Sequence, residues 1–185
     1  MREIEAHFLE VDPEAVGQKL SALGAKKVQD EIIIDRIYEH LSDSDWHKHK
    51  KRVRLRQDGK KSQITFKELK DFNVLGGTEE LETEISDLKA MEQILLYLGL
   101  SLKRRAEKRR VRYILNTIKF DLEFWPKLKP LLEIESDSED KVREGAKLLG
   151  LNWENANFMD MKDIYEKIYN IPIENIKILT FDKFE

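Results

Sequence analysis

Pairs of glutamates recur three times along this chain, each pair separated by one residue and set among apolar neighbours. Such alternation is the period-two pattern of a β-strand, so each pair directs two carboxylates from one strand face. Carboxylate oxygens are the ligands that hard divalent cations such as Mg²⁺ and Mn²⁺ prefer. The candidate metal ligands are Glu3 with Glu5, Glu82 with Glu84, and Glu133 with Glu135.

Basic residues on alternate positions mark two further predicted strands, within residues 52–56 and 103–112, and a return strand over 62–67 carries Lys67. Strand alternation places the basic residues of each segment together on one face. The fixed fork of donors on arginine suits phosphate oxygens. The basic residues that alternation assigns to this face, and that could hold phosphate oxygens, are Arg52, Arg54, Arg56, Lys67, Lys108 and Arg110. Segment 103–112 alone resembles a nucleic-acid patch or localisation signal, but a turn at Asn116 and a following strand favour a β-hairpin.

Composition excludes several other classes of protein. The charges nearly cancel, at −3 with 33 basic and 36 acidic residues, whereas duplex-binding proteins usually carry a large positive excess. The absence of cysteine excludes disulfides and thiolate metal sites. No apolar run is long enough for a signal peptide or membrane span, so we expect a cytoplasmic protein with no membrane partner. The length of 185 residues predicts a single domain over 1–185.

Each glutamate strand is followed by a predicted helix and a Leu-Gly pair, which suggests one unit used three times. Helices are expected over 12–23, 87–98 and 137–149. A fourth is expected over 158–170, and the apolar segment near the end predicts that residues 158–185 pack on the body of the domain. Residues 40–51 are predicted to form a polar loop, and their three histidines lack the cysteines or carboxylate spacing of a metal site.

The charged residues that alternation assigns to the faces of these strands require a common explanation. Burying so many charges in a dry core would cost several kcal/mol per ion. They are therefore either solvent-facing on an ordinary α+β domain, or they line a wet cavity filled by a charged ligand. A closed sheet would supply such a cavity, and a polyphosphate with a divalent metal would suit both signs of charge. No Ser-His-Asp or Cys-His arrangement points to covalent catalysis.

The chain resembles the CYTH family, or triphosphate tunnel metalloenzymes, which includes class IV adenylate cyclases and thiamine triphosphatases. The resemblance rests on motifs in family order over nearly the whole chain: Glu3-Ile4-Glu5-Ala6-His7, Val53–Arg56, Ile64–Lys67, Glu82-Thr83-Glu84, Glu107–Arg110, Phe120-Asp121 and Leu132–Glu135. Trp125-Pro126 and Ile164-Tyr165 resemble the prokaryotic class-IV-cyclase-like branch. The first motif departs from Glu-x-Glu-x-Lys, because His7 stands at the lysine position.

The resemblance implies an α+β fold, in which about eight antiparallel strands form a closed β-barrel or tunnel with helices packed outside. It implies Mg²⁺ or Mn²⁺ as cofactor and a catalytic group of Glu3, Glu5 and His7. It places Arg54, Arg56, Lys67, Lys108 and Arg110 on the triphosphate. The metal ligands would come from Glu3, Glu5, Glu82, Glu84, Asp121, Glu133 and Glu135.

The function that the resemblance implies is metal-dependent hydrolysis of a small triphosphate, such as tripolyphosphate, ATP or thiamine triphosphate. One alternative is a class IV adenylate cyclase, which converts ATP to cyclic AMP and pyrophosphate with the same parts. A second alternative is a module that binds a triphosphate or nucleotide with weakened catalysis, because His7 replaces the lysine. No nucleic-acid partner is expected, and a homodimer would be consistent with the family.

Overall fold

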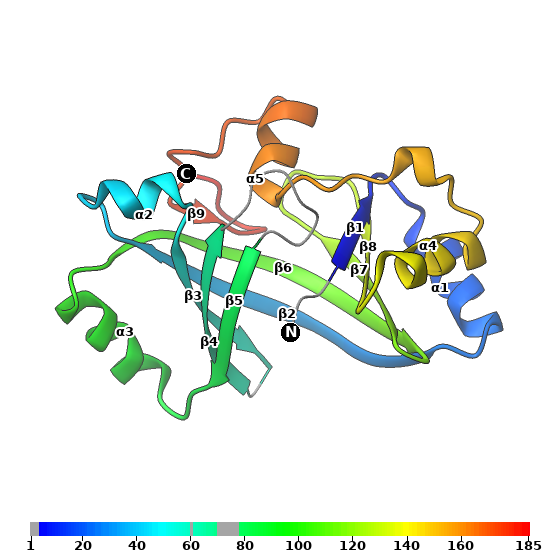
Figure 1. The fold of residues 1–185 in the computed structure, drawn as a ribbon, viewed down its shortest axis with the longest axis horizontal. Helices are drawn as coiled ribbons and strands as arrows, with labels where there is room; N and C mark the ends of the chain where they lie inside the picture. The colour runs from blue at the N-terminus through cyan, green and yellow to red at the C-terminus, as the bar shows by residue number, and fades with distance from the viewer. Residues whose placement is uncertain (1–3, 60, 70–77) are drawn as a thin grey trace. The chain divides into compact units, whose positions relative to one another are not determined.

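The computed structural model describes residues 4–59, 61–69 and 78–185 (Figure 1). Glu3 and the glycine pair at 76–77 therefore lie outside the described residues. The chain divides into two compact units. The first comprises Ile32–Glu107 and Ile176–Glu185, and the second comprises residues up to Glu31 together with Lys108–Asn175.

The strands are β1 (Ile4–Phe8), β2 (Lys26–Glu39), β3 (Arg52–Asp58), β4 (Lys61–Leu69), β5 (Thr78–Glu84), β6 (Ser101–Leu115), β7 (Ile118–Phe124), β8 (Leu131–Ser136) and β9 (Ile178–Leu179). Neighbouring strands pair in the order β1-β8-β7-β6-β2-β3-β4-β5, and the short β9 lies parallel to β6. The long strands β2 and β6 run through both units. The predicted α+β class with about eight antiparallel strands is confirmed.

The helices are α1 (Pro13–Ala22), α2 (Ser44–Lys48), α3 (Leu88–Tyr97), α4 (Glu139–Leu148) and α5 (Met161–Asp163), with a 3₁₀ turn η1 (Trp153–Asn155) and a π-type turn η2 (Ile164–Ile168). No helix in the described part of the chain has the length and apolar character that crossing a membrane requires.

The three predicted strand–helix repeats are confirmed as β1–α1, β5–α3 and β8–α4. Asp12 begins α1 as expected, since its Oδ1 accepts hydrogen bonds from the backbone N–H groups of Glu14 and Ala15 at 2.9 and 3.2 Å. The glycine after each helix adopts positive φ, at +79° for Gly24, +85° for Gly99 and +66° for Gly150. This left-handed conformation explains the recurring Leu-Gly pair.

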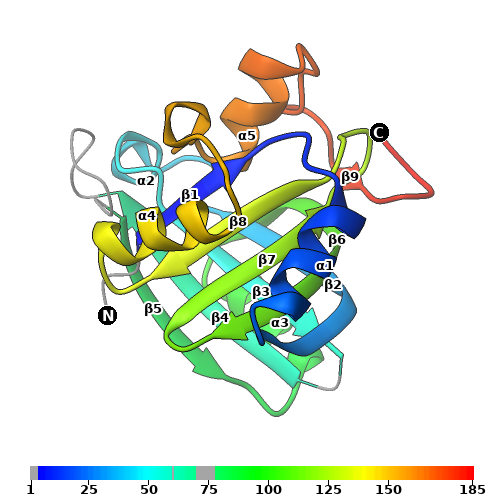
Figure 2. The ribbon, with the colours of Figure 1, turned by 90° about the vertical axis from the view of Figure 1, so that its right-hand side faces the viewer.

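Helices α1 and α4 pack on the same side of the strands of the second unit (Figure 2). Their apolar residues and those of the strands form one core, whose fully buried members include Ala6, Leu20, Phe120, Leu132, Ile134 and Val142. Because strand side chains alternate, this core takes the even-numbered positions of β1, β7 and β8. The opposite sheet face is left to the charged, odd-numbered positions.

The first unit has its own core around Tyr38, Val53 and Leu55, which α3 covers with Leu95. The arginines of β3 therefore occupy the face opposite Val53 and Leu55, as alternation predicts. The loop expected over 40–51 contains the short helix α2, so that prediction was incomplete. Asp43 begins α2 because its side chain accepts a hydrogen bond from the backbone of Asp45 at 2.9 Å.

The fourth helix is shorter than predicted and begins three residues later, at Met161. Asp160 sets this start, because its Oδ1 accepts a hydrogen bond from the backbone N–H of Asp163 at 2.9 Å. The helix then widens into η2, where Ile164 and Tyr165 are fully buried. In the tail, Ile178 and Leu179 pair with Arg105 and Ala106 of β6.

Close approach of α4 to the sheet depends on Gly145. A methyl group there would lie 3.0 Å from Ile134 Cγ2 and 3.2 Å from both Ile118 Cγ2 and Phe120 Cε1. We expect Gly145→Ala to lower the free energy of unfolding by about 1–3 kcal/mol, because overpacking outweighs the better helix propensity of alanine. Gly17→Ala in α1 is the matched control, since its methyl group meets only the Tyr113 hydroxyl at 3.2 Å. Urea denaturation of both variants checks this, and equal stability of Gly145→Ala and wild type would contradict it.

Candidate functional site

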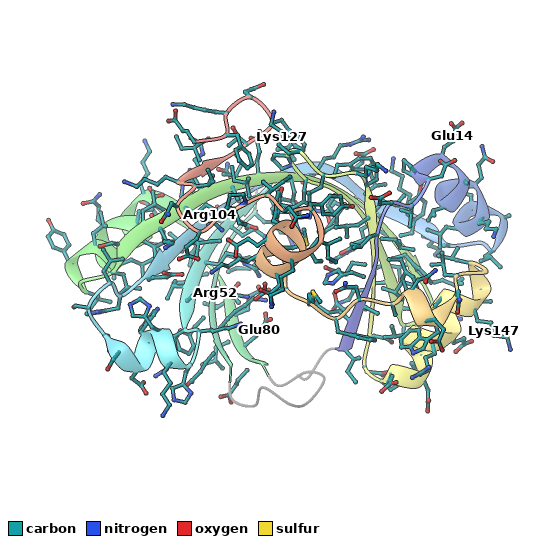
Figure 3. The ribbon with its side chains drawn as sticks, turned by 90° about the horizontal axis from the view of Figure 1, so that it is seen from above. Glu14, Arg52, Glu80, Arg104, Lys127 and Lys147 are labelled. Atoms are coloured by element: carbon teal, nitrogen blue, oxygen red, sulfur yellow. The ribbon has the colours of Figure 1, made fainter. Side chains whose placement is uncertain are left out.

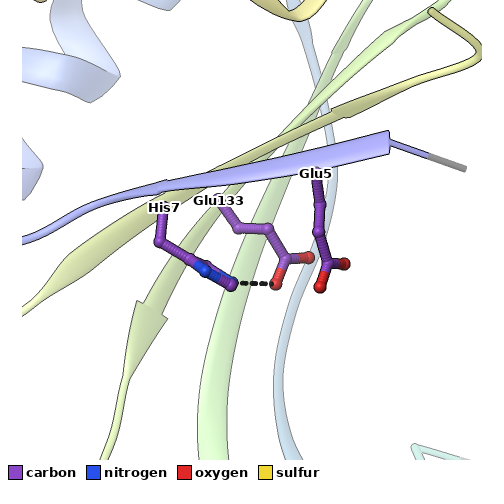
Figure 4. A group of neighbouring side chains, drawn as sticks. All are labelled: Glu5, His7 and Glu133. Carbon is purple, nitrogen blue, oxygen red and sulfur yellow. Dashed lines mark hydrogen bonds and ion pairs between the residues drawn. The ribbon is translucent and has the colours of Figure 1, made fainter. Parts of the chain in front are cut away.

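Strands β1, β8 and β7 bring acidic residues from distant parts of the second unit side by side. Glu133 of β8 lies opposite His7 of β1 on one side and Asp121 of β7 on the other. Glu135 lies in the same way opposite Glu5 and Lys119. Directly opposite residues in a sheet project from the same face, so these side chains converge. Figure 4 shows Glu5, His7 and Glu133 extending from the same side of their strands.

Glu133 belongs to two groups of residues that could hold a metal ion. One group is Glu5, His7 and Glu133, and the other is Asp121, Glu133 and Glu135. In each group the candidate ligand atoms lie within 4.8 Å of one another. The oxygens fit a hard cation such as Mg²⁺ or Mn²⁺, because both ions favour carboxylate ligands. The metal ligands predicted at these positions of β1, β7 and β8 are therefore brought together.

His7 and Glu133 form a buried pair with Nε2 and Oε2 3.2 Å apart. Burial alone would raise the pKa of Glu133, but the hydrogen bond from His7 and the charge of Arg110 hold it well below its usual range. Burial alone would lower the pKa of His7, but the hydrogen bond to Glu133 and its charge raise it above the ordinary value. His7 therefore carries a positive charge more readily than a free histidine does, as a lysine would.

The cations Lys108 and Arg110 of β6 lie among these carboxylates and are themselves buried. Arg110 places Nε 3.1 Å from Asp121 Oδ2 and 2.9 Å from Glu123 Oε1, while its Nη2 is 3.6 Å from Glu133 Oε1. Lys108 donates a hydrogen bond to Glu123 Oε1. Two candidate phosphate ligands thus lie beside the candidate metal ligands, as the alternation of β6 predicted.

Two further cations neutralise the outer carboxylates of this cluster. Arg112 donates from Nε to Asp121 Oδ1 at 2.7 Å, and Lys119 donates from Nζ to Glu135 Oε1 at 2.7 Å. The sequence analysis missed Lys119 and, more importantly, the fully buried Glu123. Glu123 follows Asp121 by two residues, so the alternation that placed Asp121 on this face could have found it.

In the first unit the candidate phosphate ligands have different surroundings. Arg54 Nη2 lies 3.2 Å from Thr65 Oγ1 and 3.5 Å from Glu82 Oε2, while Arg54 Nε is buried without a hydrogen-bond partner among the described residues. Burial, and then the charge of Arg56, lowers the pKa of Arg54. Arg56 instead forms a bidentate ion pair with Asp35, at 2.8 and 2.9 Å. Asp35 is a partner that the sequence analysis did not identify.

The remaining predicted residues of this unit lie on β4 and β5. Lys67 forms an ion pair with Glu80, and burial lowers its pKa. Glu82 accepts a hydrogen bond from the Thr65 hydroxyl at 2.7 Å, so it belongs with Arg54. Glu84 is exposed and pairs with Lys61 at 3.4 Å. Figure 3 labels Glu80 of β5 and Arg52 of β3.

The position of Glu133 in both carboxylate groups generates a prediction that needs no substrate. Glu133→Gln is expected to weaken Mn²⁺ binding about 10–100-fold, because it removes a charged ligand while keeping the side-chain shape. Glu139→Gln is the matched control, since Glu139 lies exposed on α4 and pairs with Arg143 at 2.6 Å. Calorimetric titration with Mn²⁺ measures both. Equal Mn²⁺ affinities in the two variants would exclude Glu133 as a ligand.

Comparison with known proteins identifies the family of this chain. The family model described as the CYTH domain matches residues 1–160. No curated protein matches the chain. The match covers β1 to β8 and therefore every residue of the clusters described above.

Three solved structures illustrate the similarity of fold. The PH1012 protein of Pyrococcus horikoshii OT3 is 29% identical with a TM-score of 0.69, covering 85% of this chain and 95% of that one. A Vibrio parahaemolyticus protein provisionally described as an adenylate cyclase is 14% identical with a TM-score of 0.76, covering 90% and 98%. HpAC1 of Hippeastrum, described provisionally as an adenylyl cyclase with a dominant triphosphatase activity, is 14% identical with a TM-score of 0.61, covering 91% and 96%. The last two likenesses show the fold alone.

Proposed function

The chain belongs to the CYTH family, and we propose that it is a metal-dependent enzyme that hydrolyses a small triphosphate. The observation that carries this proposal is the set of neighbours around Glu133. Its side chain lies with candidate metal ligands on β1 and β7, and within 3.6 Å of the guanidinium of Arg110. Carboxylates for a hard cation beside cations for phosphate oxygens are what a metal–triphosphate complex requires.

The metal ligands in this proposal are the carboxylates of Glu133, Asp121, Glu135 and Glu5. Mg²⁺ or Mn²⁺ bound there would neutralise phosphate charge and polarise the reacting phosphorus. Glu3, Glu82 and Glu84, which the family resemblance also implies as ligands, remain proposals. Of these, Glu82 and Glu84 lie in the first unit with basic partners of their own, Arg54 and Lys61.

Lys108 and Arg110 bind phosphate oxygens in this proposal, and we extend the same role to Arg54, Arg56 and Lys67. Arg54 supports this extension, because its buried Nε has no hydrogen-bond partner among the described residues. A buried guanidinium N–H that lacks an acceptor costs free energy, which an arriving phosphate oxygen would recover.

The proposed reaction is attack of water on the terminal phosphorus, which breaks the bond to the bridging oxygen and releases orthophosphate and a diphosphate. Glu5 is exposed within the Glu5–His7–Glu133 group and takes the proton that the water loses. His7 supplies a positive charge at the reacting end, where the Glu-x-Glu-x-Lys motif has a lysine. In this role the hydrogen bond to Glu133 and its charge raise the pKa of the imidazole above its ordinary value.

The substrate panel is the first test of the proposal. Orthophosphate release is measured from tripolyphosphate, ATP and thiamine triphosphate, each with Mg²⁺ and with Mn²⁺, together with an assay for cyclic AMP. We expect orthophosphate from at least one substrate, and loss of about 100-fold or more in kcat for Glu133→Gln but not for Glu139→Gln. Pyrophosphate with cyclic AMP would instead make the protein a cyclase, as the description of the Vibrio protein suggests.

A second candidate function, triphosphate binding without turnover, is favoured by His7 alone. Under our proposal His7→Lys changes kcat by less than about tenfold, because the hydrogen bond to Glu133 already raises the pKa of His7 and favours the charged form that the motif lysine would supply. Under the binding alternative the wild type binds tripolyphosphate in calorimetry without cleaving it, and His7→Lys raises the rate strongly. A rate increase well above tenfold would therefore contradict our assignment of His7.

A further inference from the structure

Glu123 is a fully buried carboxylate of the second-unit cluster that contacts two cations and an indole. Its side chain is 1% exposed. One oxygen accepts hydrogen bonds from Lys108 and from Arg110 Nε, and the other accepts from Trp125 Nε1 at 2.7 Å. Among the described residues Glu123 belongs to neither group that could hold a metal. This carboxylate holds two cations and an indole rather than a ligand.

Trp125 connects this carboxylate to the C-terminal part of the unit. Its only polar atom donates to Glu123, and Lys108 Nζ lies over its ring at 4.8 Å from the centroid. On another side the ring meets Tyr165 edge-on, with centroids 6.5 Å apart at 83°. Trp125 therefore contacts Lys108, Glu123, which accepts a hydrogen bond from Lys108, and Tyr165 of η2.

Tyr165 fixes the segment that carries Trp125. Its ring is fully buried, and its hydroxyl donates a hydrogen bond of 2.6 Å to the carbonyl oxygen of Pro126. Tyr165 of the π-type turn η2 thus contacts the Trp125-Pro126 pair twice, through the ring of Trp125 and through the backbone of Pro126. A buried hydrogen bond of this kind stabilises one arrangement, because breaking it strands a polar group away from water.

Lys108 and Arg110 need these fixed contacts because other carboxylates also attract them. Arg110 Nε lies 3.1 Å from Asp121, and its Nη2 lies 3.6 Å from Glu133. Without Glu123, the buried Lys108 and Arg110 would need countercharges from these same carboxylates, to which our proposed function gives the metal. Glu123 supplies a further negative charge to which Lys108 and Arg110 both donate, so the two cations do not depend on Asp121 and Glu133 alone.

We propose that Glu123, Trp125 and Tyr165 form a positioning relay, which orients Lys108 and Arg110 for phosphate oxygens and makes that orientation depend on the docking of α5 and η2. The role in phosphate binding rests on the proposed function, whereas the positioning of Lys108 does not. None of the three residues contacts the substrate in this proposal, and each acts through Lys108 or Arg110.

The positioning is tested first without any substrate, by the acetylation rate of Lys108 measured by mass spectrometry on the folded protein. Trp125→Phe keeps an aromatic ring but removes the donor to Glu123, and Tyr165→Phe removes only the hydroxyl. We expect Trp125→Phe to raise the reactivity of Lys108 about tenfold, with a smaller rise for Tyr165→Phe. Lys119 is the internal control and should not change. Trp153→Phe is the matched control variant, since Trp153 stacks on Phe8 and Arg143 instead.

The same variants are then examined with tripolyphosphate and Mn²⁺. Trp125→Phe is expected to raise KM about tenfold with kcat within about threefold, because cations that grip the phosphates equally in ground and transition states affect KM alone. Mn²⁺ affinity should not change. In a Lys108→Met background, Trp125→Phe should add much less to KM than it does alone, because its effect passes through Lys108. We expect the same changes in KM and kcat for Glu123→Gln, provided that this variant folds.

Each outcome separates this inference from the proposed function. Unchanged reactivity of Lys108 in both aromatic variants would overturn the relay whatever the substrate is. Equal rises at Lys108 and Lys119 would also overturn it, because they indicate general loosening of the unit. A rise confined to Lys108, in a protein that neither binds nor cleaves tripolyphosphate, would support the positioning and contradict the proposed function. A rise with the KM effect supports both.

Discussion

Pairing of buried charge is the constraint that the rest of this structure satisfies. A carboxylate or guanidinium removed from water costs several kcal/mol unless a partner compensates it. One sheet face of the second unit carries Asp121, Glu123 and Glu133, all buried, against the buried cations Lys108 and Arg110. Cross-strand pairing compensates these charges, since Arg110 of β6 pairs with Asp121 and Glu123 of the neighbouring β7, and Glu133 of β8 pairs with His7 of β1. Such a face compensates its buried charges with its own residues, and it carries the groups to which our proposed function assigns the metal and the triphosphate.

The sheet makes this pairing possible because alternation separates two environments on the same strands. Even-numbered positions of β1, β7 and β8 build the core under α1 and α4, while odd-numbered positions carry the charge. A shift of register by one residue would place the carboxylates in the apolar core, so core and cluster enforce the same register. Gly145 strengthens this coupling, since it lets α4 approach Ile134 closely, directly after Glu133.

Sequence alone predicted those features that depend on local spacing. Strand alternation placed Asp121, Lys108 and Arg110 on one face, and caps and glycines located three of the helices. It could not predict that Asp35 pairs with Arg56, because this contact depends on which strands lie side by side across 21 residues. The same alternation could have placed Glu123 on this face. Its role depends on Trp125 and Tyr165, whose contacts follow from the path of the C-terminal segment. Glu3 lies outside the described residues, so its role stays a prediction.

We propose that Glu133 and its neighbours hold a divalent metal while Lys108 and Arg110 bind phosphate. A crystal structure of the protein with Mn²⁺ and a non-hydrolysable tripolyphosphate analogue tests it most directly, since Mn²⁺ can be located by anomalous scattering. We expect an anomalous peak at bonding distance from a Glu133 oxygen, with analogue oxygens within hydrogen-bond distance of Lys108 and Arg110. An analogue bound elsewhere, with no metal at Glu133, would contradict it.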